Sequence, residues 1–305
     1  METLLRHGVE VPNSCRAGAC QSCLLRSAHH PDPLPETSQK GLKSTLIEQG
    51  YFLSCVCLPN QDMVIEPAGG LELKATIESL EHLTPTVLRL RLRPTEPFDY
   101  RAGQYVTLLR PDGLARSYSL ASLPVDGTLE LHVRRTERGQ MSGWLFNQAR
   151  ENESVSIRGP AGNCFYTLGN PQQPFLLAGT GTGLAPLLGI CRDALHQGHT
   201  GPISLYHGAL RKAGLYCRAE LNQLESAYPN FRYHPVVLEN DEATDGIRSG
   251  TLDQAIAADL PKLAGWRGFI CGDPSIVRRL RKKLFLAGMA SRDIYADEFV
   301  EAPVR

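Results

Sequence analysis

Apolar and polar residues alternate differently in three successive stretches of the chain. From about residue 71 to residue 168, short runs of alternating apolar and polar residues are separated by proline and glycine. Alternation with a period of two is typical of strands with one buried face. We therefore predict a small antiparallel β-barrel, with strands at residues 71–79, 87–93, 105–109, 129–134 and 155–158.

After Pro174 the pattern changes to apolar runs that alternate with longer helix-like segments. Strands are expected at residues 175–178, 203–206, 232–238 and 268–271, and a helix at residues 184–196. Strands that alternate with helices in this way predict a parallel α/β domain.

The first part of the chain is short and ends in a strand-like run, residues 63–67, followed by Ala68-Gly69-Gly70, a natural linker. A chain of 305 residues is long enough for two or three domains. We predict three, at residues 1–68, 71–168 and 171–305.

The charge of the chain excludes several classes of partner. It carries 32 lysines and arginines and 32 aspartates and glutamates, so nothing indicates binding to nucleic acid or to an anionic membrane. No apolar run approaches the roughly 18 residues of a membrane span, and the first residues are not an export signal. We expect reduced thiols and a cytoplasmic location.

A group of cysteines provides the clearest chemical signal. Cys15, Cys20 and Cys23 have the spacing C-x4-C-x2-C, and two further cysteines, Cys55 and Cys57, follow downstream. This is the spacing of a plant-type [2Fe–2S] cluster site. A four-thiolate zinc site favours C-x2-C pairs, and nine irregularly spaced cysteines do not indicate a disulfide framework.

The fourth cluster ligand has two candidates. Cys55 and Cys57 are two residues apart, so on an extended segment both side chains would point to the same face, and spacing does not decide between them. Residues 53–59, however, resemble the Leu-(Ser/Thr)-Cys-x-x-x-Pro segment of plant-type ferredoxins. The resemblance implies that Cys55 is the ligand and that Cys57 is a buried, small apolar residue.

Two segments of the expected barrel contain groups suited to a flavin nucleotide. Arg116, Ser117, Tyr118 and Ser119 form one extended segment, in which the arginine can pair with phosphate, the tyrosine can lie on a flavin ring and Ser119 can hydrogen-bond near its nitrogens. An ordinary edge strand is the alternative. The second segment is a predicted glycine turn that begins a short helix, and it consists of Gly139, Gln140, Met141 and Ser142. The free amides at the start of this helix suit a pyrophosphate. An ordinary helix start is the alternative.

Two further segments lie at the expected carboxyl ends of parallel strands, where ligands bind in open α/β sheets. Gly179, Thr180, Gly181, Thr182 and Gly183 form a glycine loop between a strand and a helix. Its G-x-G-x-G spacing differs from the G-x-G-x-x-G fingerprint, and a tight turn remains the alternative. The other segment is Cys271, Gly272 and Asp273. The alternative for Cys271 is that it is an ordinary buried thiol of the core and contacts no ligand.

Taken in order, these motifs resemble the ferredoxin–NADP reductase superfamily over essentially all 305 residues. The motifs are R-x-Y-S, G-x-x-S, G-T-G-x-G-x-A-P, C-G-x-P and an aromatic residue near the C-terminus. With the cysteine motif in front, the chain resembles the reductase component of a multicomponent oxygenase. The resemblance implies a β-grasp [2Fe–2S] domain, an antiparallel barrel that binds FAD, and an α/β domain that binds a nicotinamide nucleotide.

The resemblance also implies roles for individual residues. FAD would be held by Arg116, Tyr118 and Ser119, with phosphate contacts from residues 139–142. The nicotinamide nucleotide would lie at residues 180–183, with Cys271 and Gly272 near the nicotinamide and Phe299 close to the flavin. The candidate catalytic residues are then Ser119, Cys271 and Phe299. No general base is expected, because the protein has to position the cofactors and not to transfer protons.

The implied function is electron transfer from NAD(P)H through FAD to the cluster and on to an oxygenase component. A deoxysugar dehydratase system or a soluble carrier is an alternative acceptor, and a redox sensor without turnover is an alternative function. Arg211 and Lys212 are suited to the 2′-phosphate of NADPH but are also ordinary exposed cations; the resemblance favours NADH. The cations at residues 278–283 suit a docking patch, although a solvated helix face is the simpler interpretation.

The beginning of the chain departs from the family. The cysteine loop starts 15 residues from Met1, and residues 2–5 resemble the helix that precedes this loop in ferredoxins. The leading hairpin of the β-grasp fold is therefore missing from this sequence. Either the true start lies upstream of Met1 or this cluster domain is unusual, and we expect the first.

Overall fold

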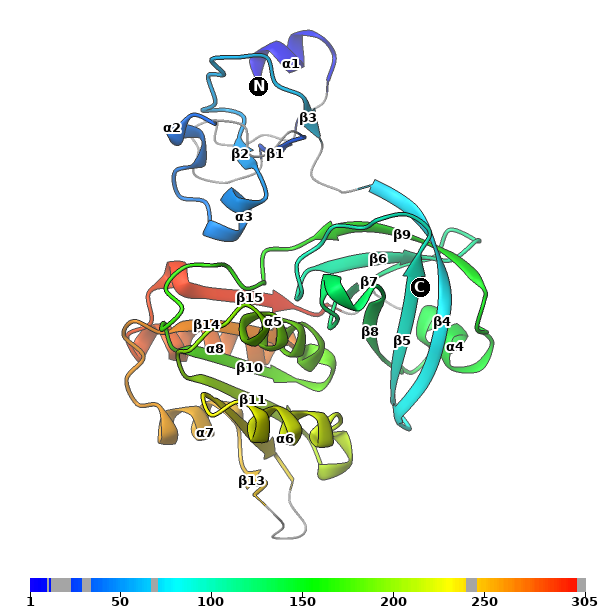
Figure 1. The fold of residues 1–305 in the computed structure, drawn as a ribbon, viewed down its shortest axis with the longest axis vertical. Coiled ribbons are helices and arrows are strands. Elements are labelled where there is room, and N and C mark those ends of the chain that lie inside the picture. Colours follow the sequence, from blue (N-terminus) through cyan, green and yellow to red (C-terminus); the bar gives the residue numbers. More distant parts are fainter. Residues whose placement is uncertain (10, 12–22, 29–33, 67–70, 240–245, 301–305) are drawn as a thin grey trace. The chain divides into compact units, whose positions relative to one another are not determined.

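The computed structural model describes residues 1–9, 11, 23–28, 34–66, 71–239 and 246–300. The chain divides into two compact units, Met1–Gly70 and Leu71–Arg305. Figure 1 labels most of the helices and strands of both units. No helix within the described residues is long and apolar enough to cross a lipid bilayer.

The first unit contains a three-stranded antiparallel sheet in the order β2-β1-β3. Its elements are α1 (Glu2–Arg6), β1 (Leu24–Ser27), α2 (Glu36–Gln39), α3 (Ser44–Glu48), β2 (Tyr51–Leu53) and β3 (Ile65–Glu66). Its core is formed by Val11, Leu25, Phe52 and Cys57. The helix expected at the start of the chain is present, and its apolar side chains pack against this core.

The first half of the second unit is the predicted antiparallel barrel. Its strands, in the sheet order β7-β6-β9-β4-β5-β8, are β4 (Leu71–Thr84), β5 (Val87–Pro94), β6 (Tyr105–Leu109), β7 (Ala115–Ser119), β8 (Leu129–Arg134) and β9 (Ser154–Ala161). An antiparallel bridge between Leu120 and Leu131 joins the two ends of this order, so the sheet closes. A short 3-10 turn, η1 (Pro124–Asp126), and a helix, α4 (Gln140–Asn147), complete it.

The second half of this unit is a six-stranded parallel sheet in the order β13-β12-β11-β10-β14-β15. Its strands are β10 (Phe175–Thr180), β11 (Ile203–Ala209), β12 (Phe231–Val237), β13 (Arg248–Ser249), β14 (Arg267–Gly272) and β15 (Ile294–Glu298). Its helices are α5 (Leu184–His196), α6 (Arg218–Ala227), α7 (Leu252–Asp259) and α8 (Pro274–Leu286), and the 3-10 turns are η2 (Gly181–Gly183), η3 (Lys212–Gly214) and η4 (Ser291–Asp293).

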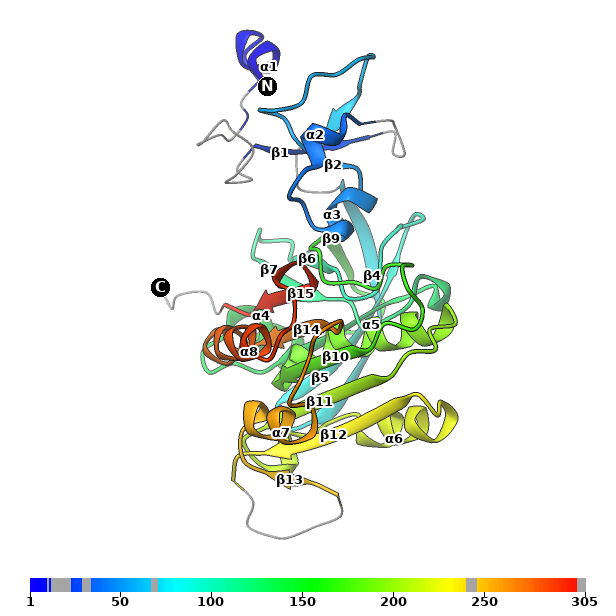
Figure 2. The ribbon, with the colours of Figure 1, turned by 90° about the vertical axis from the view of Figure 1, so that its left-hand side faces the viewer.

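Alternate side chains of each central strand of this sheet enter different cores. Leu177 of β10 packs with α5 and α6 on one face, and its neighbour Leu176 packs with α7 and α8 on the other. Figure 2 shows the two helix pairs on opposite sides of the sheet. Because both faces are covered, the central strands are mostly apolar, which explains the apolar runs in the sequence.

A buried polar network joins the barrel to the parallel sheet. Arg89 of β5 is 5 % exposed, and it forms ion pairs with Glu130 of β8 at 3.2 Å and with Glu220 of α6. Burial alone would raise the pKa of Glu130, but the hydrogen bond from His132 and the charges of His132, Arg89 and Arg91 lower this pKa to about 2. The arginine is therefore held by carboxylates from both halves of the unit.

The network continues from Glu130 through aromatic side chains. His132 Nε2 lies 2.9 Å from the Glu130 carboxylate and donates to it, and His132 Nδ1 lies 3.0 Å from the Tyr216 hydroxyl. The ring of Tyr216 also meets the ring of His207 edge to face, with centroids 5.4 Å apart. His207 of β11 lies opposite Gly179, the first residue of the glycine loop. The network therefore extends from the barrel wall to the carboxyl end of β11.

We predict that acid destabilises the protein through His207. This side chain is wholly buried, and burial lowers its pKa to about 3, with a further lowering by His132 and a partial offset by the Gly181 carbonyl. Because its folded pKa lies below the unfolded value of about 6.5, the unfolded state binds more protons, and stability falls as pH drops through about 6.5. The free energy of unfolding should fall by roughly 1 kcal/mol between about pH 7.5 and pH 5.5 from this residue alone.

Denaturant unfolding at the two pH values measures this effect. His207→Gln should reduce the pH dependence, and His196→Gln, which changes an exposed histidine of α5, should leave it unchanged. An identical pH dependence in His207→Gln and the native chain would show that this histidine does not contribute.

Candidate functional site

Two of the four predicted cluster cysteines lie side by side. Cys23 directly precedes β1, Cys55 follows β2 by two residues, and these neighbouring strands pair Leu24 with Leu53. Their sulfur atoms are 3.1 Å apart, too far for a disulfide bond of about 2.05 Å and close enough for one metal ion to bind both. Ser54 fixes the turn, since its hydroxyl and its amide both donate to the Cys23 carbonyl. The other two predicted ligands, Cys15 and Cys20, lie outside the described residues.

Cys57 has a different environment from Cys55. The chain turns over residues 54–56 and does not run extended, so the two side chains do not share a face as an extended segment would require. Cys57 is 8 % exposed and packs with Leu25 and Phe52, and burial raises the pKa of its thiol. It is therefore the buried, small apolar residue that the sequence predicted.

The predicted flavin segment forms β7, at the junction of the barrel with the parallel sheet. Tyr118 is half-buried against the barrel core, and burial raises the pKa of its hydroxyl. Ser119 is buried, and its hydroxyl lies 3.5 Å from the Asp297 carboxylate at the end of β15. Arg116 is partly exposed and Ser117 is exposed, so the arginine remains accessible to an anionic ligand.

The second flavin segment lies at the start of α4. Gly139 is the N-cap, and a Cβ atom there would lie 2.0 Å from the Thr136 hydroxyl, so the chain needs glycine at this point. Met141 is buried in the barrel core, and the Ser142 hydroxyl bonds to Thr136 at 3.1 Å. Both side chains are used by the fold, and the Gly139 amide donates to the Thr136 carbonyl at 3.1 Å, so the amides of residues 140–142 and the exposed Gln140 are the groups offered to a ligand.

The glycine loop rests directly on β14. A Cβ atom on Gly179 would lie 2.8 Å from the Cys271 carbonyl oxygen, and one on Gly183 would lie 2.3 Å from it. Side chains are therefore excluded, and the backbone of residues 179–183 comes close to Cys271 and Gly272. Cys271 itself is buried, and burial raises the pKa of its thiol.

Phe299 and Asp273 occupy different positions at this edge. The Phe299 amide donates to the Gly272 carbonyl at 2.8 Å, which holds the aromatic residue at the end of β14. Asp273 caps α8, because its carboxylate accepts from the amides of Ser275 and Ile276. The Ser275 hydroxyl also donates to this carboxylate, and its bond, together with the two amide bonds, lowers the pKa of Asp273. The side chain thus has a structural task in addition to the predicted cofactor contact.

Asp297 is a candidate site residue that the sequence analysis missed. It is half-buried, burial raises the pKa of its carboxyl group, and it lies between Ser119 and the strand that carries Cys271. Its charge also raises the pKa of Tyr105, which burial has already raised. One feature of the sequence could have pointed to Asp297: it is a carboxylate two residues before the predicted site residue Phe299.

These positions suit the groups that the motifs predict. The paired thiols of Cys23 and Cys55 are soft ligands for iron. Glycine in place of larger residues in the loop permits close approach of a diphosphate to the backbone. Ser119, Cys271 and Asp297 converge from the barrel and from two strands of the sheet.

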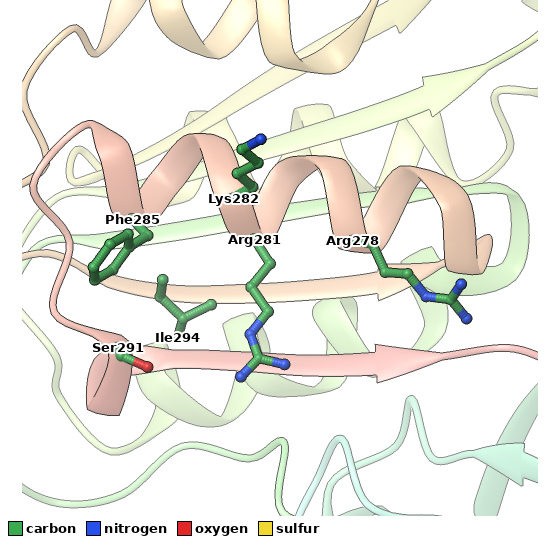
Figure 3. A pocket seen from close by; sticks show the side chains of 6 residues that line it. All are labelled: Arg278, Arg281, Lys282, Phe285, Ser291 and Ile294. Atoms are coloured by element: carbon green, nitrogen blue, oxygen red, sulfur yellow. The ribbon is translucent and has the colours of Figure 1, made fainter.

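A separate pocket lies on α8. It is an open depression of about 290 Å³ between this helix and the start of β15, shown in Figure 3, and it is lined by Arg278, Arg281, Lys282, Phe285, Ser291 and Ile294. Arg278 forms an ion pair with Glu298 at 2.8 Å, and the neighbouring Arg279 with Asp253 at 3.1 Å. The opposite side of α8 is buried through Val277, Leu280 and Leu284, so the cations belong to its outward-facing side. None of the predicted cofactor residues lines this pocket.

Three parts of the chain each match a known domain family. Residues 1–60 match the 2Fe-2S iron-sulfur cluster binding domain, residues 74–166 the oxidoreductase FAD-binding domain, and residues 177–282 the oxidoreductase NAD-binding domain. The three matches follow in the order that the motifs predict.

Relatives match along the whole chain. The ferredoxin–NAD(P)+ reductase component of the naphthalene 1,2-dioxygenase system of Pseudomonas putida is 33 % identical over 308 residues, covering 98 % of this chain and 92 % of that protein. The crystal structure of an Amycolatopsis cytochrome P450 reductase is 32 % identical with a TM-score of 0.71, covering 98 % and 93 % of the two chains. A CDP-6-deoxy-L-threo-D-glycero-4-hexulose-3-dehydrase reductase of Yersinia pestis is 27 % identical over 313 residues, covering 98 % and 92 %.

We predict that Cys55 and Cys57 respond differently to substitution. Cys55→Ser removes a thiolate that lies beside Cys23, so the purified protein should lose most of its iron and its visible cluster absorbance. Cys57→Ala, the matched control, changes only a packed side chain and should retain both. Loss of the cluster in Cys57→Ala with retention in Cys55→Ser would reverse the assignment.

We also predict that Gly183→Ala weakens nucleotide binding. The new Cβ atom would lie 2.3 Å from the Cys271 carbonyl oxygen and 3.0 Å from Gly272 Cα, so the loop must move away from β14. A displacement of this kind should raise the Kd for the nicotinamide nucleotide by about tenfold or more, with the FAD content unchanged. Equilibrium titration measures the Kd, and Gly169→Ala is the control because its nearest non-neighbouring atoms are 4.0 Å away. Equal Kd values for both variants would contradict the proposed close approach.

Proposed function

Because the chain belongs to the family of iron–sulfur flavoprotein reductases that serve as reductase components of oxygenase systems, we propose that it supplies electrons to an oxygenase component. The electrons come from a nicotinamide nucleotide, pass through FAD to the [2Fe–2S] cluster, and leave the chain from the cluster. The observation that carries the proposal is the convergence of Ser119, Cys271 and Asp297 where the barrel meets the carboxyl edge of the parallel sheet.

The order of the carriers follows from the number of electrons that each transfers. A nicotinamide gives up two electrons together as hydride, whereas a [2Fe–2S] cluster takes one. When bound, flavin accepts hydride and releases electrons singly, so it belongs between the other two. The residues of this chain then have the task of holding the two nucleotides in contact, and no acid–base dyad is required.

Each candidate residue has a role in this arrangement. Arg116 pairs with the FAD phosphate, Tyr118 lies on the flavin ring, and Ser119 hydrogen-bonds near its reactive edge. The backbone amides of residues 140–142, which follow the glycine turn at Gly139, supply further phosphate contacts. Asp297 is added to this set, since its side chain lies within reach of the Ser119 hydroxyl at 3.5 Å.

The parallel sheet provides the second nucleotide site. The loop of residues 179–183 accommodates the diphosphate of the nicotinamide nucleotide, because its glycines leave the backbone accessible. Cys271 and Gly272 lie at the nicotinamide, and Phe299, anchored to the Gly272 carbonyl, lies close to the flavin. Cys15, Cys20, Cys23 and Cys55 hold the cluster.

An oxygenase component is the preferred electron acceptor because the naphthalene dioxygenase reductase component matches along nearly the whole chain. A deoxysugar dehydratase is the second candidate acceptor, and the dehydrase reductase of Yersinia pestis is the observation that favours it. We place the protein in the cytoplasm, since the described cysteines are thiols and the cluster is stable in a reducing compartment.

A redox sensor without turnover is the function from another class. Such a module does not need two nucleotide sites, whereas this chain matches both a FAD-binding and an NAD-binding domain. Steady oxidation of NADH with an artificial one-electron acceptor such as ferricyanide is expected from a reductase. Reduction of the flavin once, without continued turnover, would favour the sensor.

We predict that removal of the cluster separates the two halves of the reaction. In Cys55→Ser, stopped-flow bleaching of the flavin by NADH should keep its native rate within about twofold, because hydride transfer needs only the second unit. Reduction of cytochrome c, a one-electron protein acceptor, should fall by about tenfold or more. Cys57→Ala should behave as the native protein in both assays. Loss of flavin bleaching in a Cys55→Ser protein that retains its FAD would contradict the order of carriers.

A further inference from the structure

The depression on α8 combines positive charge with apolar surface. Four of its lining residues lie at positions i, i+3, i+4 and i+7 of the helix and therefore share one side of it: Arg278, Arg281, Lys282 and Phe285. Ser291 of η4 and Ile294 of β15 form the remaining wall. Figure 3 shows the Arg281 side chain extending from α8 toward β15. The depression is therefore built by elements that the fold holds together.

The depression carries an excess of positive charge. Arg278 forms an ion pair with Glu298 at 2.8 Å. The hydrogen bond from Arg278 and the charges of Arg278 and Arg281 lower the pKa of Glu298, so both arginines act on this one carboxylate. Within the part of the chain that the structure describes, Arg281 and Lys282 have no ion pair of their own. Their charges are therefore available to attract an anion.

An exposed aromatic ring supplies the apolar part of the depression. Phe285 is 57 % exposed, whereas Leu284, which precedes it, is buried in the core. Covering such a ring with another apolar group is favourable, since it removes the surface of both from water. A helix face that is simply solvated explains the cations but gains nothing from an exposed ring among them. The combination of ring and cations therefore favours a ligand.

The chemistry of these groups defines the ligand. An arginine binds a carboxylate through two parallel hydrogen bonds, and aromatic rings pair in offset or edge-to-face arrangements. The volume of about 290 Å³ lies at the lower end of the range for small-molecule sites, roughly 300–1,000 Å³, so the ligand must be small. An inorganic anion would leave the ring of Phe285 uncovered, and a neutral aromatic molecule would leave Arg281 without a partner.

We propose that this depression is a binding site for a small aromatic carboxylate, whose carboxylate pairs with Arg281 and whose ring covers Phe285. None of the predicted cofactor residues lines the depression, so the site is additional to the two nucleotide sites and to the cluster. The inference goes beyond the proposed function and does not depend on it.

Equilibrium dialysis of the full-length protein, loaded with FAD and in the presence of excess NAD+, tests the proposal with biphenyl-4-carboxylate as the probe. Occupied nucleotide sites keep the probe away from the flavin segment and the glycine loop. The native protein should bind one probe molecule per chain with a Kd below about 1 mM. Arg281→Gln and Phe285→Ala should each raise this Kd by about fivefold or more, because each removes one of the two contacts. Native protein that binds no probe below about 10 mM would overturn the proposal.

Each variant has a matched control on the same helix. Lys283 and Leu286 are exposed residues of α8 that do not line the depression. Lys283→Gln and Leu286→Ala should therefore leave the Kd within about twofold of the native value. Retained FAD in all four variants shows that they are folded. An equal Kd in Arg281→Gln and Lys283→Gln, or in Phe285→Ala and Leu286→Ala, would also contradict the proposal.

Two related compounds test the class of ligand. Biphenyl-4-carboxamide keeps the rings without the charge, and acetate keeps the charge without the rings. Both should bind at least about tenfold more weakly than the probe. Equal binding of the carboxamide would show an apolar surface without a charge contact, and equal binding of acetate would show a site for any anion. Either result would rule out a site for aromatic carboxylates.

Discussion

Hydride transfer between two bound nucleotides requires their reacting atoms within about 3.5 Å, and the rest of this structure depends on that constraint. The flavin segment lies on β7 of the barrel, and the glycine loop and Cys271 lie on the parallel sheet. These two layers meet through Ser119 and Asp297. Any movement between them would separate donor from acceptor, so the junction must be rigid.

Buried polar contacts supply this rigidity on the far side of the junction. Arg89 reaches from the barrel to Glu220 of α6, and His132 reaches from the barrel to Tyr216. Buried charges are stable only when they are fully paired, and here the partners come from both layers. Moving the two layers apart would leave a buried charge without its partner. This cost keeps the barrel and the parallel sheet in one relative position. The same network ends at His207 beside the glycine loop, so it couples the nucleotide site to the barrel.

Much of this architecture could be predicted because it depends on local patterns. The apolar run at residues 175–178, the helix at residues 184–196 and the glycine loop between them are found as expected in β10, α5 and η2. Strand β4 extends five residues further than predicted, to Thr84, because irregular pairing with β5 near Ile77 and His82 disturbs its alternation. The short strands β13 and β15 were missed, since two and five residues carry little periodic signal.

Contacts between distant parts of the chain could not be predicted from the same patterns. Asp297 becomes a site residue only because β15 is parallel to β14 and ends opposite Ser119 of the barrel. Spacing alone did not distinguish Cys55 from Cys57; the turn at residues 54–56 places one beside Cys23 and the other in the core. The roles given to individual side chains at the cofactors remain predictions.

Anaerobic titration of the purified protein with NADH tests the central claim most directly. If electrons pass through FAD to the cluster, the chain should take up roughly three electrons, two at the flavin and one at the cluster. The visible absorbance of the cluster should then bleach in addition to that of the flavin. Uptake that stops at about two electrons, with the cluster still oxidised in the presence of excess NADH, would contradict the account.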